Sequence, residues 1–163
     1  MPEAGRPNIS TRKMNKQVGT VNVRKISAEE TYPLRKAELR KGMKLTHRMA
    51  GDQDVETLHL GVFEEEKLVC IGSFMKASKD YFSGNQYQLR GMATANDRQG
   101  KGYGKMILNE AEQVLKDKQA DVIWCNARLV AIDFYKKMGY RVQGSIFEVA
   151  EVGPHYMMYK ELK

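Results

Sequence analysis

The residues whose types and spacing could carry chemistry gather in one glycine-rich stretch, Arg98-Gln-Gly-Lys-Gly-Tyr-Gly-Lys105. Three glycines at alternate positions let a backbone turn tightly and bring its N–H groups close to a ligand. An amphipathic helix is predicted to follow directly, and the N-terminus of a helix carries a partial positive charge. Together these features favour an anion site, which in proteins is most often a phosphate site.

Two familiar phosphate loops do not fit this stretch. The nucleoside-triphosphate loop needs four residues between its first glycine and a Gly-Lys pair, but Gly100 and Gly104 enclose three. Met106 also stands where that loop needs Ser or Thr. The dinucleotide fingerprint needs glycine three positions after its second glycine, where this chain has Lys105. The residues alone therefore leave two readings, an anion site of another kind or a tight strand-to-helix connection.

A strand before the stretch and a helix after it must hold it in place. Residues 87–95 have the pattern of a strand, and residues 103–118 place apolar side chains on one helical stripe. Residues 122–125 form a short apolar run, which is typical of a strand buried on both faces. Residues 129–138 have helical spacing, and Gly139 is expected to end that helix.

The first helix has two conflicting signals at its start. Ser27 and Glu30 have the spacing of a capping box, which satisfies exposed backbone donors at a helix N-terminus. Pro33 would then fall inside the helix, where proline removes a backbone hydrogen bond. We therefore expect the helix to begin nearer Thr31 and to run to about Lys41.

The remaining periodic segments are predicted strands, and a turn of three glutamates between two of them favours an antiparallel hairpin. The order of elements is strand, helix, three strands, helix, strand, helix and two strands. This order predicts an α/β fold of the α+β kind, a mixed sheet flanked by helices. The further strands are expected at residues 21–26, 57–63, 67–75, 140–149 and 155–161.

Length and composition set outer limits. The chain has 163 residues, 27 of them basic and 20 acidic, for a net charge of +7. This charge leaves nucleic acid, an anionic membrane surface and a small polyanion open as partners. Two cysteines, Cys70 and Cys125, favour a reducing, cytoplasmic compartment over a disulfide framework, and they have no zinc-site spacing. The longest nearly apolar run, residues 68–75, is too short to span a membrane. We also expect no bound metal.

The N-terminal segment differs from the rest of the chain. Residues 1–20 hold four basic side chains against one acidic one, two of the four prolines and no apolar periodicity. We expect a disordered tail over residues 1–20 and one domain over residues 21–163.

The glycine-rich stretch and a second block downstream fit one family pattern. Gln99-Gly-Lys-Gly-Tyr-Gly104 matches a Gln/Arg-x-x-Gly-x-Gly/Ala motif, and Leu89-Arg-Gly-Met-Ala-Thr94 resembles the strand that precedes it. Residues 126–140 resemble the next block, in which an Asn ends a strand and a Phe-Tyr pair on a helix precedes a Gly-aromatic pair. The chain thus resembles the GCN5-related N-acetyltransferases (GNAT), and shorter matches resemble a bacterial subgroup whose substrates we cannot name.

The resemblance implies the acyl-CoA N-acyltransferase fold. In it the sheet is mostly antiparallel, and one parallel strand pair splays apart to admit the pantetheine arm of acetyl-CoA, the co-substrate. Backbone groups of Met92, Ala93 and Thr94 would pair with the pantetheine and polarise the thioester carbonyl, and Asn126 would cap or bridge to the cofactor. The pyrophosphate would be held by Arg98, Gln99, Gly100, Lys101, Gly102, Tyr103, Gly104 and Lys105.

The implied reaction is direct attack of a neutral amine on the thioester within a ternary complex. The family's general acid, a tyrosine, corresponds to Tyr135, since a phenol can protonate a departing thiolate while staying protonated at neutral pH. Cys125 lacks an activating partner in the sequence, so we expect it to pack as a small apolar residue.

The sequence leaves the general base and the acceptor open. Glu148 and His155 are candidates for the base or the acceptor site, and His59 is a further candidate base. Arg35 on the first helix and Arg90 on a strand make an anionic acceptor a further hypothesis. In this fold, the first helix with its following loop and the last strands choose the acceptor.

Two other functions stay in competition with an N-acetyltransferase. One is an acyl-CoA-binding sensor without turnover. The other is a basic nucleic-acid-binding protein, although the chain has no zinc-finger spacing, basic region with heptads or RNA-binding sheet motif. Exposed strand edges in this fold often pair, so a homodimer stays open. Part of the positive charge surrounds the glycine-rich stretch, which makes CoA the partner that best fits it.

Overall fold

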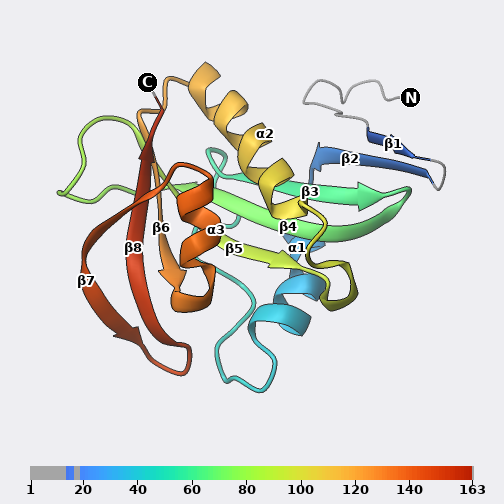
Figure 1. Cartoon of the computed structure of the whole chain (residues 1–163), viewed down its shortest axis with the longest axis horizontal. Coiled ribbons are helices and arrows are strands. Elements are labelled where there is room, and N and C mark those ends of the chain that lie inside the picture. Colours follow the sequence, from blue (N-terminus) through green and yellow to red (C-terminus); the bar gives the residue numbers. More distant parts are fainter. Residues whose placement is uncertain (1–13, 17–18, 163) are drawn as a thin grey trace.

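The computed structural model describes residues 14–16 and 19–162. Within these residues, eight strands form one sheet in the order β1-β2-β3-β4-β5-β6-β8-β7, and only β5 and β6 pair in parallel. The predicted mixed, mostly antiparallel sheet is thereby confirmed (Figure 1). The strands are β1 (Met14–Lys16), β2 (Gly19–Lys25), β3 (Leu58–Glu64), β4 (Lys67–Lys76), β5 (Gln86–Thr94), β6 (Val122–Arg128), β7 (Arg141–Val149) and β8 (Gly153–Glu161).

The first strands begin earlier than the sequence pattern indicates. Residues 14–16 and 19–20 fall in the predicted tail, yet Met14 pairs with Val21 and Lys16 with Gly19 in a hairpin between β1 and β2. The segment has little apolar periodicity, so sequence patterning gives no strand signal there. The disorder predicted for residues 1–13 lies outside the described residues.

Helices cover both faces of the sheet (Figure 1). Neighbouring residues of a strand point to opposite faces, and on β4 the position of a Cβ at Gly72 is 2.9 Å from Ile107. The next residue, Ser73, accepts a hydrogen bond from Arg35. Helices α2 (Tyr103–Asp117) and α3 (Ile132–Lys137) therefore lie on one face, and α1 (Ala28–Leu34) with its continuation η2 (Arg35–Leu39) lies on the other.

Helix α1 begins at Ala28, and the expected start near Thr31 is wrong. Ser27 and Glu30 form the complete capping box, with Glu30 N–H donating to Ser27 Oγ over 3.1 Å and Ser27 N–H to Glu30 Oε1 over 2.7 Å. These two bonds hold the first turn although Pro33 lies inside the helix. Beyond Pro33 the helix widens into the π-helical turn η2, in which the last amide bonds to a carbonyl five residues back.

The core lies between α2 and the central strands. Side chains of β3 and β4 are buried along nearly their whole length, and the apolar stripe of α2 packs on these two strands. The stripe matches the helical pattern in the sequence. Fully buried members of this core are Leu60, Val62, Phe74, Ile107, Leu108 and Leu115.

Strands β5 and β6 part halfway along their length. Their parallel pairing covers Gln86 to Leu89 on β5 and Val122 to Cys125 on β6. Each strand then continues, to Thr94 and to Arg128, without pairing with the other. The splayed parallel pair that the family resemblance implied is thus confirmed.

A β-bulge re-aims β5 beside this opening. On β4, Ile71 and Ser73 are two residues apart, whereas their partners on β5, Ala93 and Arg90, are three apart. The extra residue on β5 is accommodated at Gly91, whose φ of +65° suits glycine. Because of the bulge, the side chains of β5 after Gly91 point to the face opposite to the one that regular alternation would give them.

Candidate active site

The glycine-rich loop forms an open turn before α2. Gly100 and Gly102 have φ values of +78° and +85°, left-handed conformations that favour glycine. A Cβ at either position would meet no atom within 4 Å, so the space beside these two glycines is open. Gly102 caps α2 without a side chain, and the first turn holds no acidic residue. The first backbone N–H groups of α2 therefore remain available to an anion.

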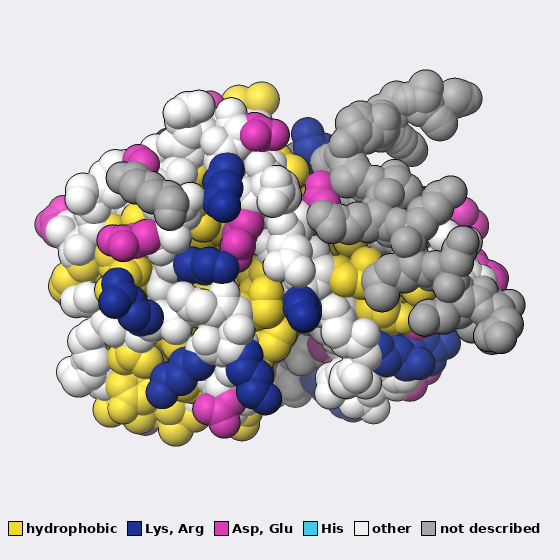
Figure 2. Space-filling view, turned by 45° about the horizontal axis from the view of Figure 1, so that its top comes forward, with side chains coloured by type: hydrophobic (Ala, Val, Ile, Leu, Met, Phe, Trp, Pro, Cys, Tyr) yellow, Lys and Arg dark blue, Asp and Glu magenta, His cyan; other side chains and the backbone are white. Residues whose placement is uncertain are grey.

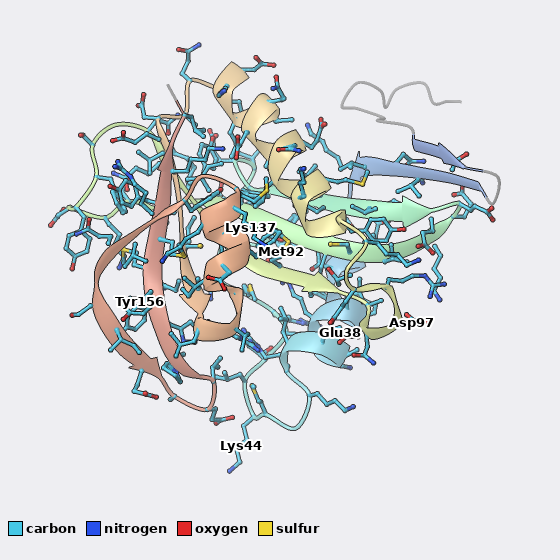
Figure 3. All side chains as sticks on the ribbon, viewed as in Figure 1. Glu38, Lys44, Met92, Asp97, Lys137 and Tyr156 are labelled. Atoms are coloured by element: carbon cyan, nitrogen blue, oxygen red, sulfur yellow. The ribbon has the colours of Figure 1, made fainter. Side chains whose placement is uncertain are left out.

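Gly104 has a different task, close packing. A Cβ there would lie 3.1 Å from Phe134 of α3 and 3.9 Å from Met92 Sδ. The absent side chain lets the first turn of α2 approach α3 and β5, and Figure 3 shows Met92 beside both helices. The loop is thereby held directly beside the opening between β5 and β6.

Two side chains of the loop turn toward Glu64 at the end of β3. Arg98 Nε donates to Glu64 Oε1 over 2.7 Å, and the Tyr103 hydroxyl donates to Glu64 Oε2 over 2.5 Å. Arg98 also pairs with Asp97 at 3.0 Å. Sequence reasoning missed Glu64, because a single glutamate at a hairpin turn carries no signal of a partner so distant in the chain. Arg98 is thus already paired with carboxylates, although the sequence placed it among residues for pyrophosphate.

Glu64 makes the anchoring of this loop sensitive to acid. Hydrogen bonds from Tyr103 and Arg98 lower the pKa of Glu64, and burial with the bond to Glu64 raises the pKa of Tyr103 to about 12. A carboxyl group with a lowered pKa stabilises the fold above its ordinary pKa and loses that effect as pH falls through the folded value. We expect Glu64→Gln to reduce the free energy of unfolding by about 1 kcal/mol at pH 7.

Urea unfolding of Glu64→Gln and the native chain across pH 2.5–8 measures this effect. The difference between the two proteins should shrink below about pH 4, where the native carboxyl group also becomes neutral. Glu66→Gln is the matched control, because Glu66 lies at the same turn but its side chain is 88% exposed and, among the described residues, forms an ion pair only with Arg24. A difference for Glu64→Gln that does not change with pH contradicts the assignment.

The remaining predicted cofactor residues lie around the loop and the opening. On β5, Ala93 is buried, and its neighbours Met92 and Thr94 are half-buried. The side chains at the remaining positions are exposed: Gln99, Lys101, Lys105 and Asn126. Asn126 is the first residue of β6 after its last pairing with β5. The predicted cofactor residues thus lie on the part of β5 beyond its pairing with β6, in the glycine-rich loop and on β6 after its pairing with β5: Met92, Ala93, Thr94, Gln99, Lys101, Lys105 and Asn126.

Tyr135 lies where the two strands part. Tyr135 is 6% exposed, and its hydroxyl lies near Cys125, the last residue of β6 that pairs with β5. Burial, with a smaller contribution from Cys125, raises the pKa of Tyr135 well above its ordinary value. The hydroxyl therefore stays protonated at neutral pH.

Comparison with known proteins identifies this arrangement. The model of the Acetyltransferase (GNAT) family matches residues 19–140, which include the loop, the opening and Tyr135. The chain belongs to the GNAT acetyltransferase family. It is also similar to YitI of Bacillus subtilis (strain 168), an uncharacterized N-acetyltransferase, with 32% identity over 145 residues that cover 88% of this chain and 97% of YitI.

Solved structures share the fold of this GNAT protein. Escherichia coli ElaA superposes with a TM-score of 0.72 at 14% identity, over 86% of this chain and 99% of ElaA. An aminoglycoside 6'-N-acetyltransferase complexed with coenzyme A superposes with a TM-score of 0.67 at 11% identity, over 86% and 97% of the two chains. These likenesses confirm the acyl-CoA N-acyltransferase fold implied by the sequence.

Neither thiol of the GNAT site is set up as a nucleophile. Burial raises the pKa of Cys125 to about 12 and that of Cys70 to about 11. Cys70 lies 3.2 Å from Thr94 Oγ1 and Cys125 lies near Tyr135, and neither thiol has a basic partner among the described residues that would remove its proton. Both pack as small apolar residues, as expected for Cys125 from the sequence.

The three candidate bases occupy different environments. Both ring nitrogens of His59 are engaged, Nδ1 with Ser73 Oγ at 2.6 Å and Nε2 with the Asp52 carbonyl at 3.0 Å, so His59 is a buried structural residue. His155 uses Nδ1 on the Gly153 carbonyl at 2.8 Å, and its Nε2 has no hydrogen-bond partner among the described residues. Glu148 is exposed on β7.

Strand register separates the last two candidates. His155 pairs directly with Arg128 across β6 and β8, so both side chains lie on the same face of the sheet. Glu148 neighbours Phe147, the cross-strand partner of His155, and therefore points to the opposite face. Of Glu148 and His155, only His155 shares a face with α1.

Arg35 is not available to an acceptor, contrary to the hypothesis drawn from the sequence. Its side chain is fully buried and donates to both carboxylate oxygens of Asp52, over 2.9 and 3.0 Å. Arg90 has no ion-pair partner among the described residues, and the charges of Arg90 and Arg128 both act on Arg40; the sequence pattern singled out neither Arg40 nor Arg128. No spacing in the sequence reveals that these three residues from separate elements converge.

Two features bear on other classes of protein. Over residues 14–16 and 19–162, no three His, Cys, Asp or Glu side chains are grouped so that they could hold a metal ion. Within that same part of the chain, no helix is long and apolar enough to cross a membrane.

Proposed function

We propose that this GNAT protein transfers the acetyl group of acetyl-CoA to an amine acceptor by direct attack within a ternary complex. One observation carries the proposal, the end of β5–β6 pairing at Leu89 and Cys125. The opening that results has the glycine-rich loop at its side and the Tyr135 hydroxyl at its base. A thioester entering this opening meets a proton donor and unpaired strand backbone together.

Backbone groups account for most of the proposed CoA binding. The N–H groups of residues 99–105 at the start of α2 receive the pyrophosphate, and the exposed side chains of Lys101 and Lys105 add positive charge. Arg98 contributes only its backbone, because Glu64 and Asp97 hold its guanidinium group. Backbone groups of residues 92–94 pair with the pantetheine arm and polarise the thioester carbonyl, and Asn126 lines the other side of the opening.

The proposed chemistry needs one proton donor and one proton acceptor. The neutral acceptor nitrogen attacks the carbonyl carbon, so that a C–N bond forms and the C–S bond breaks. Tyr135 gives its hydroxyl proton to the departing sulfur and recovers a proton that the nitrogen releases through solvent. An amine that arrives as ammonium first loses a proton, for which His155 is the candidate because its Nε2 is free on the α1 face.

An activity assay separates this function from the two alternatives. Release of free CoA thiol is measured with acetyl-CoA and a panel of amines. Tight binding of acetyl-CoA without thiol release from any amine would favour a sensor. Salt-sensitive binding of nucleic acid without affinity for CoA would favour a nucleic-acid binder. On the face shown in Figure 2, basic side chains are interspersed with acidic ones and form no continuous stripe, which supports the enzyme over that binder.

The proposed pyrophosphate loop predicts an effect of Gly102→Ala on CoA affinity. Alanine at φ +85° is strained, and its methyl group projects into the open side of the turn. We expect the Kd for acetyl-CoA, measured by calorimetry, to rise about tenfold or more.

Gly144→Ala is the matched control for this variant. Gly144 on β7 has a similar φ of +82° and equally open surroundings, but it lies outside the loop. Both variants should lose about 1–2 kcal/mol of stability from left-handed strain. If both also lose CoA affinity equally, the loop is not the pyrophosphate site.

A further inference from the structure

Three arginines with no acidic partner converge beside the opening. Arg40 directly follows η2, Arg90 is the first residue of β5 beyond its pairing with β6, and Arg128 ends β6. All three are half-buried, and none forms an ion pair with the described residues. Arg40 donates only to the backbone carbonyls of Thr46 and Leu39. The side chains of Arg90 and Arg128 have no hydrogen-bond partner within the same part of the chain.

Strand alternation places the cluster on the α1 face. Arg90 is the cross-strand partner of Ser73, whose hydroxyl accepts from Arg35 of η2. Arg128 lies three residues beyond Cys125, which faces α3, so Arg128 points to the opposite face. The glycine-rich loop and Tyr135 lie on the α2 and α3 face. The two groups of residues thus border the same opening from opposite faces of the sheet.

The cluster is electrostatically unfavourable in the free protein. Burial, then Arg128, Arg90 and Arg35, lower the pKa of Arg40. Burial and Arg35 lower the pKa of Arg90, while Asp52 partly opposes this effect. Like charges gathered in a partly buried place weaken a fold unless something binds them.

The acidic groups near the cluster are already engaged. Asp52 is bidentate with Arg35, which neutralises that pair. Glu38 accepts from the Asn96 N–H over 2.9 Å, and Glu151 accepts from the Lys44 N–H over 2.9 Å. In the view of Figure 3, Glu38 and Lys44 lie on the segments below the opening. Neither Glu38 nor Glu151 forms an ion pair with an arginine of the cluster.

We propose that the amine acceptor carries an anionic group, a carboxylate or a phosphate, which Arg40, Arg90 and Arg128 bind on the α1 face of the opening. This inference rests on the proposed acetyl transfer, since it concerns the acceptor of that reaction. Guanidinium groups present paired N–H donors that match the oxygens of both anions. An acceptor held there has its nitrogen directed toward the opening, with His155 beside Arg128 on the same face.

Paired amines that differ only in the anion test the preference. Tyramine is compared with tyrosine for a carboxylate, and ethanolamine with O-phosphoethanolamine for a phosphate. We expect kcat/KM to be about 10- to 100-fold higher for an anionic member, as lost hydrogen bonds to a charged group imply. Arg90→Gln and Arg128→Gln should each remove this preference, so that the ratio of kcat/KM between the anionic and the neutral member falls toward one.

Arg141→Gln is the matched control, because Arg141 lies on β7 over the ring of Tyr159 and outside the cluster. It should keep the preference. Equal rates for neutral and anionic amines in both pairs overturn the inference, and so does a preference that survives both cluster substitutions.

Two further measurements do not depend on turnover. The protein is saturated with CoA and titrated with inorganic phosphate, and arginine Nε resonances are followed by NMR; those of Arg90 and Arg128 should shift and that of Arg141 should not. Arg90→Gln should also raise the melting temperature, by about 1–4 °C, because it relieves repulsion. A lower melting temperature together with unshifted resonances overturns the inference.

These results distinguish the two proposals. Phosphate binding at the cluster without transfer to any amine rejects the proposed reaction and keeps the anion site. Transfer to amines without an anion preference keeps the reaction and rejects the anion site.

Discussion

Replacing Tyr135 with Phe is expected to lower kcat for acetyl transfer by about 10²- to 10⁴-fold, the usual contribution of a positioned general acid. The hydroxyl is buried at the base of the opening, and its removal leaves the departing thiolate without a proton donor. The ring keeps its edge contacts with Phe134 and Tyr140, so the fold should persist. The Kd for acetyl-CoA should stay within about twofold. Steady-state kinetics and calorimetry measure the two quantities.

Tyr140→Phe is the matched control for this substitution. Tyr140 lies on the same side of the sheet as Tyr135, and its buried hydroxyl has no hydrogen-bond partner in the described residues. Its removal should leave kcat unchanged and should not weaken the fold. Because burial raises the pKa of Tyr135, the native enzyme should show no loss of kcat from Tyr135 ionisation up to about pH 10. An unchanged kcat in Tyr135→Phe, with the native acceptor, contradicts the assignment.

The second large effect concerns stability. Asp52→Ala is expected to reduce the free energy of unfolding by about 3–5 kcal/mol, because it leaves the fully buried Arg35 charge without its partner. The carboxylate also accepts from the Met49 N–H over 2.9 Å and so fixes the loop after η2. That loss is a large share of the stability of an ordinary domain. Urea unfolding followed by circular dichroism measures it.

The pH dependence of this pair has a defined sign. Burial opposes ionisation of Asp52, but hydrogen bonds from Arg35 and Met49 outweigh it and lower the pKa. The contribution is present above the ordinary pKa of aspartic acid and is lost as pH falls through the folded value. Glu66→Ala, which breaks the exposed pair with Arg24, should cost less than 1 kcal/mol. A loss as small as that in Asp52→Ala rejects the buried pair as a major stabilising contact.

Sequence reasoning recovers the elements whose signals are local. The apolar run of residues 67–75 and the apolar stripe of residues 103–118 are patterns of neighbouring residues, and strand β4 and helix α2 appear almost at their predicted bounds. The start of α1 is misplaced because Pro33 outweighed the capping box in the prediction. In the protein, Pro33 cannot donate one backbone hydrogen bond, and the helix accommodates this loss by continuing as the π-helical turn that follows.

The site divides in the same way. The glycine-rich loop can be predicted from the sequence, because its positive φ values favour glycine at particular positions. The ion pairing of Arg98 cannot be predicted from the sequence, since its partner Glu64 lies far away in the chain, at the end of β3. Nor could the sequence choose between Glu148 and His155, because the faces they occupy depend on the register of β7 and β8, which shifts between Gln143 and Phe147.

The parting of β5 and β6 has a consequence for solubility. A strand side without a partner normally invites another chain to add to it, which leads to aggregation. Here the two unpaired sides face each other inside one sheet, and each strand is held on its other side, β5 by β4 and β6 by β8. A foreign strand would have to enter between them, whereas a thin, flexible molecule can thread in. The unpaired backbone groups of β5 and β6 can thus form hydrogen bonds with a small ligand, whereas another polypeptide cannot add to them as a strand.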